Sequence, residues 1–446
     1  MVKERLEIIE TDEAGNVTAT YVQSSTDREG ISRIDSISPK TVKSTWQKTL
    51  DVFLPAGYPH SVTSDYTEYQ IYDSVQAFSS SIAGLLSSRA VLSSVGVGDA
   101  TASPTAALFL SIFQESVGRI ATILFAHRLG TAFEPECKMY RLLADILNDI
   151  AFVLDCLSPV LPKPLRIAVL SFSSVLRALC GVAAGSAKAS LSAHFARWGN
   201  LGELNAKDSS QETVISLLGM LVGTLVVSRI STPTATWTTL IILLAVHLET
   251  NRRAVRAVVM KTLNRQRATL VYHHLKQGKV PTPETIANEE IIFERDGVLR
   301  HADGRLLGHC VVGASMSQLL SGIAQETART GSSKVDTNTL SQLLHLFRHE
   351  KYLLWYTVTG RRVHVIIIIK KDAVVADIIT AWWQALAVAE EVAKPGAETD
   401  RLDLLQRSIK TAVTCRSTYE DGLRLEGWDL TTSALETTSN TRVKME

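Results

Sequence analysis

The chain has 446 residues, enough for two or three domains, and it can bury a large core without disulfides. Its formal net charge is +1, so no global field directs it toward nucleic acid. Apolar residues make up 46% of the chain, and the mean hydropathy of +0.11 is high for a soluble protein of this size. The five cysteines show no CxxC spacing, which argues against a zinc site and against a disulfide framework.

Residues 1–43 are predicted to form a flexible polar tail, because they hold Gly, Ser, Thr and Asp without a sustained helical period. No signal or transit peptide is expected, since acidic residues stand where a leader needs an apolar or Arg-rich run. The N-terminus is therefore expected to stay in the cytosol. A short helix is predicted from Ser44 to Gly57, ending at Pro55.

Residues 44–280 are predicted to form a helical domain rich in Ala, Ser, Gly and Leu. Three of its charge-free windows are shorter than the ~20 residues that cross a bilayer, so each suits a core helix. These windows are 74–88, 100–114 and 167–176.

Two further windows, Thr213–Ser228 and Ile230–Leu248, are each about long enough to span and together predict a membrane hairpin over 213–248. Gly219 and Gly223 form a GxxxG pattern, which allows close helix contact in lipid. The alternative is a buried hairpin inside a large, soluble helical core.

Basic residues follow the predicted hairpin. Between Arg252 and Lys279 there are eight Lys or Arg and no Asp or Glu, and no Pro or Gly occurs before Gly278. One long basic helix is therefore predicted over 251–278. Basic residues beside an apolar segment mark the cytoplasmic side of a membrane and attract anionic lipid headgroups. The alternative is a solvated basic face on a soluble helix.

Residues 281–430 are predicted to form a smaller α+β domain. "IIFERDGVLRHADGRLLGHCVV" contains two DG pairs, which are hairpin signals between short strands. "YLLWYTVTGRRVHVIIIIKK" predicts strand, turn and strand, and "DAVVADIITAWWQALAVAEEVAK" predicts an amphipathic helix. Residues 431–446 are predicted to be a flexible tail. The fold class is thus mainly α, a helical membrane-associated bundle followed by a smaller α+β domain.

A polar cluster directly precedes the first arm of the hairpin, and it contains Lys207, Asp208, Ser209, Gln211 and Glu212. One interpretation is a helix start, in which Ser209 or Ser210 caps the helix and Glu212 lies in its first turn. The other is a binding site, in which the exposed N–H groups of a helix start and Lys207 bind a phosphate.

A second polar cluster holds Arg141, Asp145, Asn148 and Asp149, whose spacings of three and four place them on one helix face. This is either a solvated face with an Arg141–Asp145 ion pair or, in a membrane, the lining of a polar cavity. Asp99 follows two nearby glycines and is a candidate helix cap or a further member of that cavity. No HExxH, GxSxG or cysteine motif occurs, so neither catalytic nor metal-binding residues are predicted.

Several long motifs resemble the root UVB sensitive (RUS) family. They are "FLPAGYPHSVTSDYTEYQIYDSVQAFSSSIAGLLSSRAVLSSVGVGD", "KMYRLLADILNDIAFVLD", "AKDSSQET" and "NRRAVRAVVMKTLN". The resemblance implies a membrane-associated eukaryotic protein linked to vitamin B6 (pyridoxal phosphate) homeostasis and, in plants, to light stress and development. It implies no known reaction and no catalytic residues.

The sequence therefore predicts a non-enzymatic membrane protein that binds or transports a small metabolite in vitamin B6 homeostasis. Pyridoxal phosphate is a candidate ligand rather than a cofactor. The expected partners are the bilayer, anionic headgroups at the Arg252–Lys279 helix and a protein of the same family, with no nucleic acid. One alternative is a membrane-anchored scaffold that recruits partners through its C-terminal domain. Another is a soluble pyridoxal phosphate sensor.

Overall fold

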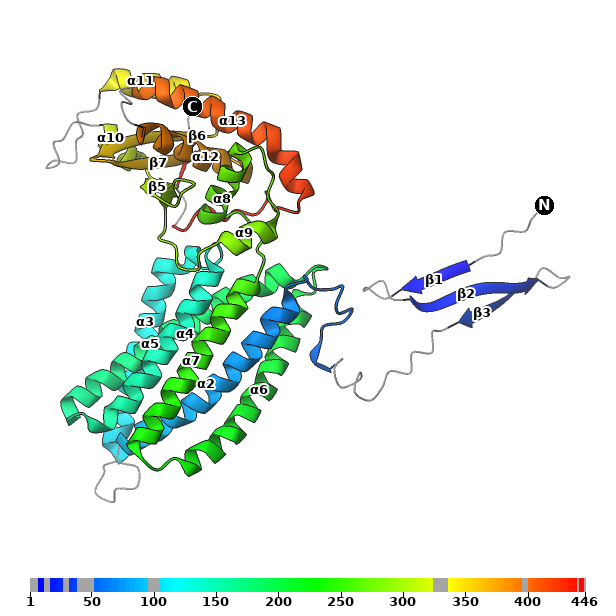
Figure 1. The fold of residues 1–446 in the computed structure, drawn as a ribbon, viewed down its shortest axis with the longest axis vertical. Coiled ribbons are helices and arrows are strands. Elements are labelled where there is room, and N and C mark those ends of the chain that lie inside the picture. The colour runs from blue at the N-terminus through cyan, green and yellow to red at the C-terminus, as the bar shows by residue number, and fades with distance from the viewer. Residues whose placement is uncertain are drawn as a thin grey trace. The chain divides into compact units, whose positions relative to one another are not determined.

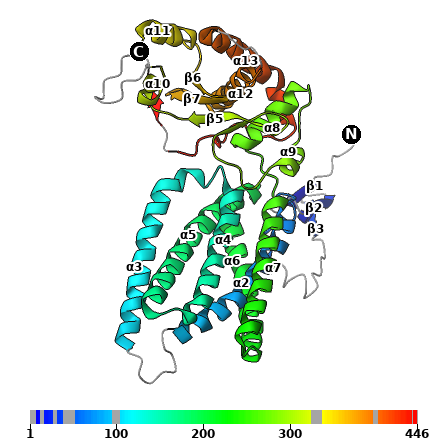
Figure 2. The ribbon, with the colours of Figure 1, turned by 60° about the vertical axis from the view of Figure 1, so that its left-hand side comes forward.

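The structure, a computed structural model, describes residues 7–11, 17–26, 32–37, 52–94, 104–323, 336–394, 400–438 and 441–444. The chain divides into two compact units. The first unit comprises Met1–Pro104, Phe152–Leu170 and Ala189–Ala257, and the second comprises Thr105–Ala151, Ser171–Lys188 and Val258–Glu446. The predicted fold class is confirmed, because long helices occupy most of the chain before a smaller region of mixed helices and strands (Figure 1 and Figure 2).

The segment predicted to be a flexible tail contains a small antiparallel sheet. Its strands are β1 (Glu7–Thr11), β2 (Val17–Thr26) and β3 (Ser32–Ile37), with β2 in the centre. β-Branched residues such as Ile8, Val22 and Ile34 recur in these strands and favour extended backbone. Most of the short helix predicted over Ser44–Gly57 lies outside the described residues.

Long helices follow. They are α2 (Tyr66–Ser94), α3 (Pro104–Leu129), α4 (Cys137–Leu157), α5 (Lys163–Phe195), α6 (Leu201–Arg229) and α7 (Pro233–Ala257), with short 3₁₀ turns η1 (Gly130–Ala132) and η2 (Ser158–Val160). Among the residues that the structure describes, three helical segments are long and apolar enough to cross a membrane. They are Leu108–Ala132, Lys163–Phe195 and Leu201–Arg229.

This outcome corrects the sequence-based choice of spans. The windows 100–114 and 167–176 are short only because a charged residue, Glu115 or Arg177, ends each one. The helices continue through these residues, and α3 and α5 have 26 and 33 residues. Of the predicted hairpin, α6 is a candidate span. α7 is not one, because threonines near its start and charged residues near its end lower its hydropathy.

Within the first unit, α2 lies between α6 and α7 (Figure 1). The two predicted hairpin arms therefore pack mainly against α2 rather than against each other. The GxxxG pattern still makes a close helix contact, but its partner is α2. A Cβ added to Gly219 would lie 2.7 Å from Ser81 Cβ, and one added to Gly223 would lie 2.7 Å from Leu85 Cδ1.

The prediction of one long basic helix over 251–278 is wrong. α7 ends at Ala257, and α8 (Arg265–Lys276) begins only after a non-helical stretch, residues 258–264. The physical reason is burial: Val258, Met260 and Leu263 enter the core of the second unit, and the Asn264 side chain caps α8 by accepting from Arg267 N at 2.8 Å.

In the second unit, α8 and α9 (Pro283–Glu289) precede a mixed sheet with the order β4-β5-β7-β6. Its strands are β4 (Val298–Arg300), β5 (Leu306–Val312), β6 (Tyr352–Thr359) and β7 (Arg362–Lys370). β5 and β7 are parallel, whereas the β4–β5 and β6–β7 pairs are antiparallel. The turns at Gly304 and Gly360, both with positive φ, confirm the second DG hairpin and the predicted strand-turn-strand. The first DG pair precedes β4 and joins no two strands.

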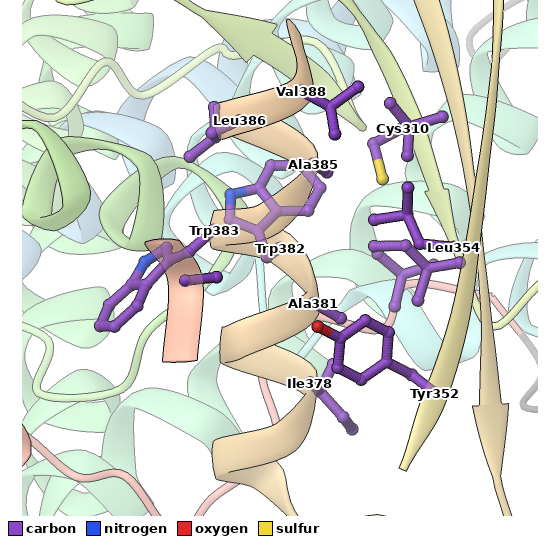
Figure 3. Close-up of a cluster of buried hydrophobic side chains, with 14 of the residues drawn as sticks. Cys310, Tyr352, Leu354, Ile378, Ala381, Trp382, Trp383, Ala385, Leu386 and Val388 are labelled. Carbon is purple, nitrogen blue, oxygen red and sulfur yellow. The ribbon is translucent and has the colours of Figure 1, made fainter. Parts of the chain in front are cut away.

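Four helices complete this region: α10 (Met316–Ile323), α11 (Thr337–Leu346), α12 (Val375–Val392) and α13 (Arg401–Leu425). α12 is predicted to be amphipathic, yet every residue from Ile378 to Ala389 is buried. Figure 3 shows why: one side of α12 faces Cys310, Tyr352 and Leu354 of the sheet, and Trp383 points away from that side. α12 is thus a central helix, enclosed by the sheet, α8 and α13.

The C-terminal segment predicted to be a flexible tail is packed where the structure describes it. Leu435 and Thr437 are buried, and β8 (Arg442–Val443) adds to β7 in parallel. Arg442 also forms an ion pair with Glu436 at 2.8 Å. The apolar residues of this short segment are too few for a periodic signal, so only their tertiary contacts indicate order.

Candidate functional site

The predicted polar cluster Lys207–Glu212 lies inside a helix and not at its start. α6 begins at Leu201, so the N–H groups of this cluster already bond within the helix and cannot bind a phosphate. Ser209 and Glu212 are exposed, and Ser209 caps nothing. The sequence interpretation failed because it placed a helix start within this polar cluster, whereas the helix already begins at Leu201, six residues before Lys207.

Three polar side chains of α6 hold the segment that precedes α2. Lys207 Nζ donates to Val52 O at 2.8 Å, and Gln211 Nε2 donates to Phe53 O at 2.7 Å. Glu203 accepts from the Ala56 N–H at 2.8 Å. These contacts explain why Lys207 and Gln211 are polar without any bound ligand.

Asp208 has a different role. It is buried, and Gln70 Nε2 of α2 donates to its Oδ1 at 2.6 Å. Of the residues predicted in this cluster, Asp208 is the one that enters the interior of the first unit.

The face of α4 with Arg141, Asp145, Asn148 and Asp149 lies in the second unit. Arg141 and Asp145 form the expected ion pair at 3.0 Å, but both are buried, so this is not a solvated face. Asp149 is buried as well, and Asn148 is partly buried. Asp99, predicted to join them, lies outside the described residues. The two predicted clusters thus belong to different units.

The first unit contains a buried polar seam along α2 that the sequence did not predict. We define this α2 seam by three pairs in which α2, or the residue before it, meets another helix. His194 Nε2 of α5 donates to Asp65 Oδ2 at 2.9 Å, and Gln70 meets Asp208 of α6. The Gln76 amide nitrogen lies 2.8 Å from His247 Nε2 of α7, and both side chains are buried.

The seam continues along the interface between α2 and α7. These helices are antiparallel, because Gln76 meets His247 whereas Arg89, further along α2, donates to Thr236 Oγ1 at 3.0 Å. Asp73, one turn before Gln76, therefore lies at the level of Asn251, one turn beyond His247, and both are buried.

Near the C-terminal end of α2, polar side chains of this helix bond to the ends of α4 and α6. Ser87 Oγ donates to Asp155 Oδ2 of α4 at 2.7 Å. Arg89 also donates to the carbonyls of Val227 and Ile230, at 3.0 and 2.8 Å, and so satisfies oxygens at the end of α6 that have no helical partner.

The outward surface of these helices has the opposite character. Leu217, Leu221 and Leu225 of α6 are exposed, as are Ile241 and Ile242 of α7. Apolar side chains outside and hydrogen-bonded polar side chains inside are the arrangement expected of helices packed in lipid. A signal for the seam was present in the sequence, since Tyr69, Asp73, Gln76 and Ser87 recur at helical spacing, but it falls partly in a window chosen for its lack of charge.

A second group of buried charges lies in the second unit. Glu290 accepts from Lys138 Nζ at 2.7 Å and from Arg267 Nη1 at 2.6 Å, and all three side chains are buried. Burial by itself raises the pKa of Glu290, but the charges of Arg267 and Lys138 lower the pKa below its usual value. Arg267, which was predicted to face lipid headgroups, is therefore part of the protein interior.

Glu136 lies beside this group and behaves differently. Asn264 Nδ2 donates to its Oε2 at 3.1 Å. Burial raises the pKa of Glu136 to about 7, because Arg267 compensates only part of the cost of desolvating the carboxylate. This carboxyl therefore changes its charge near neutral pH. Across the described part of the chain, no three His, Cys, Asp or Glu side chains are grouped so as to hold a metal ion.

Comparisons with known proteins agree with the resemblance of the motifs. The sequence profile described as "Vitamin B6 photo-protection and homoeostasis domain" matches residues 39–279. The chain is similar to RUS family member 1 of Dictyostelium discoideum, with 41% identity over 249 residues, which cover 54% of this chain and 47% of that protein. The aligned region thus spans about half the length of this relative.

Plant proteins align over more of the chain. Protein root UVB sensitive 3 of Arabidopsis thaliana is 32% identical over 361 residues, which cover 78% of this chain and 77% of that protein. Protein root UVB sensitive 2, chloroplastic, of the same plant is 26% identical over 341 residues, which cover 76% of this chain and 72% of that protein. No solved structure matches the chain.

Proposed function

Because the chain belongs to the RUS family, whose domain is linked to vitamin B6 homeostasis, we propose that it is a non-enzymatic membrane protein that transports a small metabolite of this homeostasis. The α2 seam is the proposed path, and the surrounding apolar surface is the lipid-facing side. The family is linked to vitamin B6 homeostasis but to no transported molecule, so the transport path is proposed for this chain alone.

The observation that supports transport is the placement of the α2 seam. Buried ionisable and amide side chains are costly inside membrane helices and commonly mark ion or substrate pathways. Here α2 collects such groups from α5, α6 and α7, at His194, Asp208 and His247. A polar solute that exchanges its hydrogen bonds with these groups in turn avoids full desolvation.

The test is uptake of labelled vitamin B6 compounds into vesicles that contain the reconstituted full chain. The variant Gln76→Leu/His247→Leu replaces both partners of one seam pair with apolar groups, so neither is left as a buried, unpaired polar atom. We expect uptake to fall at least tenfold, while the amount of folded protein in the vesicles stays the same.

The matched control is Thr224→Val/Ser228→Ala on α6. Both side chains are exposed, and each hydroxyl donates to a backbone carbonyl of its own helix, Met220 O or Leu225 O. The control also removes two polar groups but leaves the α2 seam intact, so its uptake should equal that of the wild type. Equal uptake by both variants would exclude the seam as the path.

Two outcomes would favour the alternatives. A chain that remains in the membrane after carbonate extraction but supports no uptake would be an anchored scaffold. A chain that carbonate releases would be a soluble sensor. Either result would overturn the transport proposal.

A further inference from the structure

The second unit contains a cavity of about 750 Å³ that is separate from the α2 seam. Its wall is formed by the end of α3, the start of α4, the start of α8, the loop before β4 and residues 437–438. This volume lies within the roughly 300–1,000 Å³ that small-molecule sites occupy. The proposed transport mechanism does not use this cavity.

The cavity is rich in arginine. Its lining includes four arginines, Arg128, Arg265, Arg295 and Arg300, against three carboxyl groups, those of Glu136, Glu294 and Asp296. With Glu136 protonated the excess is two positive charges, and with it ionised the excess is one.

Two of the four guanidinium groups are already paired. Arg265 binds Asp296 and also donates to Leu435 O at 2.8 Å, and Arg300 donates to Glu294 at 2.6 Å. The side chains of Arg128 and Arg295 form no ion pair with any residue that the structure describes. These two groups, both exposed, are therefore available to an anion.

The rest of the wall suits a small organic molecule rather than a bare ion. The Tyr140 ring is buried and packs edge-on against Phe133, with centroids 4.7 Å apart. Burial raises the pKa of Tyr140 to about 12, so its hydroxyl keeps its proton at neutral pH.

The loop before β4 is held in place from several sides. Thr437 Oγ1 donates to Asp296 Oδ2 at 2.9 Å, and Thr131 Oγ1 donates to Thr437 O at 2.9 Å. Gly297 has φ of 71°, and a Cβ there would lie 2.5 Å from Cys310 O, so only glycine fits this turn. The cavity wall is thus preorganised, which lowers the entropic cost of binding.

We infer that this cavity binds a small phosphomonoester, with the phosphate held by Arg128 and Arg295. Planar guanidinium groups match phosphate oxygens in bidentate pairs. None of the described residues that line the cavity is a lysine, so an aldehyde on the ligand would form no imine there. Recognition rests on the phosphate and not on a carbonyl group.

The direct test uses calorimetry to measure the affinity of the full chain, in detergent, for pyridoxine 5′-phosphate. The double variant Arg128→Ala/Arg295→Ala should weaken binding at least tenfold, because it removes both unpaired charges. Arg361→Ala is the matched control: this arginine is also exposed, lies in the same unit and is absent from the cavity wall, so its affinity should be unchanged.

The choice of probe tests the chemistry separately. Pyridoxine, which lacks the phosphate, should bind at least tenfold more weakly than pyridoxine 5′-phosphate. Pyridoxal phosphate, which adds an aldehyde, should bind with the same affinity as pyridoxine 5′-phosphate. Pyridoxine that binds as tightly as its phosphate would overturn the inference.

A phosphomonoester can be a soluble metabolite or a lipid headgroup, and a second arm distinguishes the two. Vesicles that contain phosphatidic acid are added to the wild type and to the double variant. Loss of binding on Arg128→Ala/Arg295→Ala in either arm supports the site and identifies the source of the phosphate. Equal binding by wild type and variant in both arms would overturn it. Vesicle uptake through the α2 seam is measured independently, so the failure of one proposal leaves the other intact.

Discussion

Glu136 is a residue whose environment matters more than its type. A glutamate at a helix start is ordinarily ionised, but here burial raises the pKa to about 7. The adjacent Glu290 has the opposite shift, because it accepts directly from both Lys138 and Arg267. Two carboxyl groups in the same part of the molecule therefore differ in charge near neutral pH, and no sequence pattern distinguishes them.

The substitution Glu136→Gln should flatten part of the pH dependence of stability. The folded carboxyl binds its proton more tightly than the unfolded one, so the wild type loses stability as the pH rises from about 4.5 to about 7. The loss is complete above that window and amounts to up to about 3 kcal/mol. Denaturant unfolding at pH 5 and pH 8 measures this loss as the difference in the free energy of unfolding between variant and wild type. A difference that does not change with pH would contradict the shift.

At the scale of elements, α6 has two parts with different tasks. Its first turns use Glu203, Lys207 and Gln211 to hold the chain before α2, and its later turns place Gly219 and Gly223 against α2. The polar cluster therefore precedes the apolar run because one helix must both fix a loop and pack closely in an apolar environment. Neither task requires a ligand at Lys207.

Gly219→Ala should destabilise the packing of α6 on α2. The added Cβ would lie 2.7 Å from Ser81 Cβ and 3.0 Å from Phe78 O, so the helices must separate, at a cost of about 1–3 kcal/mol. Gly202→Ala on the same helix is the control, because nothing lies within 4 Å of its Cβ. Its higher helix propensity should stabilise the protein by about 0.5–1 kcal/mol. Thermal unfolding in detergent measures both, and equal effects would show that the close contact is absent.

α12 shows how periodicity fails for a central helix. Its apolar residues run without interruption from Ile378 to Ala389 apart from Thr380 and Gln384, both of which are buried and hydrogen-bonded. Trp382 and Trp383 also donate to Thr269 and to Ala268 O of α8, each at 3.0 Å. A helix covered on all sides has no solvent-facing stripe, so a one-sided prediction is wrong for it.

At the scale of the whole molecule, large apolar side chains are exposed on α3, α5 and α6. Ile123 is 68% exposed and Leu225 is 67% exposed. Large apolar side chains that stay exposed along a helix are unfavourable in water, so lipid is the natural cover of each of these helices. These helices suggest membrane association without indicating the organelle or the orientation.

The purified full chain should therefore require detergent. We expect it to remain in the membrane fraction after carbonate treatment and to aggregate when detergent is removed, because water would contact the apolar faces of three helices. Size-exclusion chromatography with and without detergent measures this. A detergent-free, monodisperse monomer would contradict membrane insertion and, with it, the transport proposal.

The sequence by itself determined the helical class and the two antiparallel strand pairs β4–β5 and β6–β7, because hydrophobic periodicity and turn glycines are local signals. Long motifs indicated the family. The parallel pairing of β5 with β7 was not predicted. The sequence also named Asp208, Arg141, Asp145 and Asp149 as candidate ligand-binding residues, and all four are buried. It could not assign their partners.

Only the tertiary structure decided which polar groups meet. The pairs of the α2 seam join residues that are 129, 138 and 171 positions apart, and the cavity gathers arginines from three separate segments. Such contacts depend on how helices pack, and no spacing within one helix encodes them. The same applies to the break after Ala257: its residues are individually helix-compatible, but burying Val258 and Leu263 in a core outweighs continuing the helix.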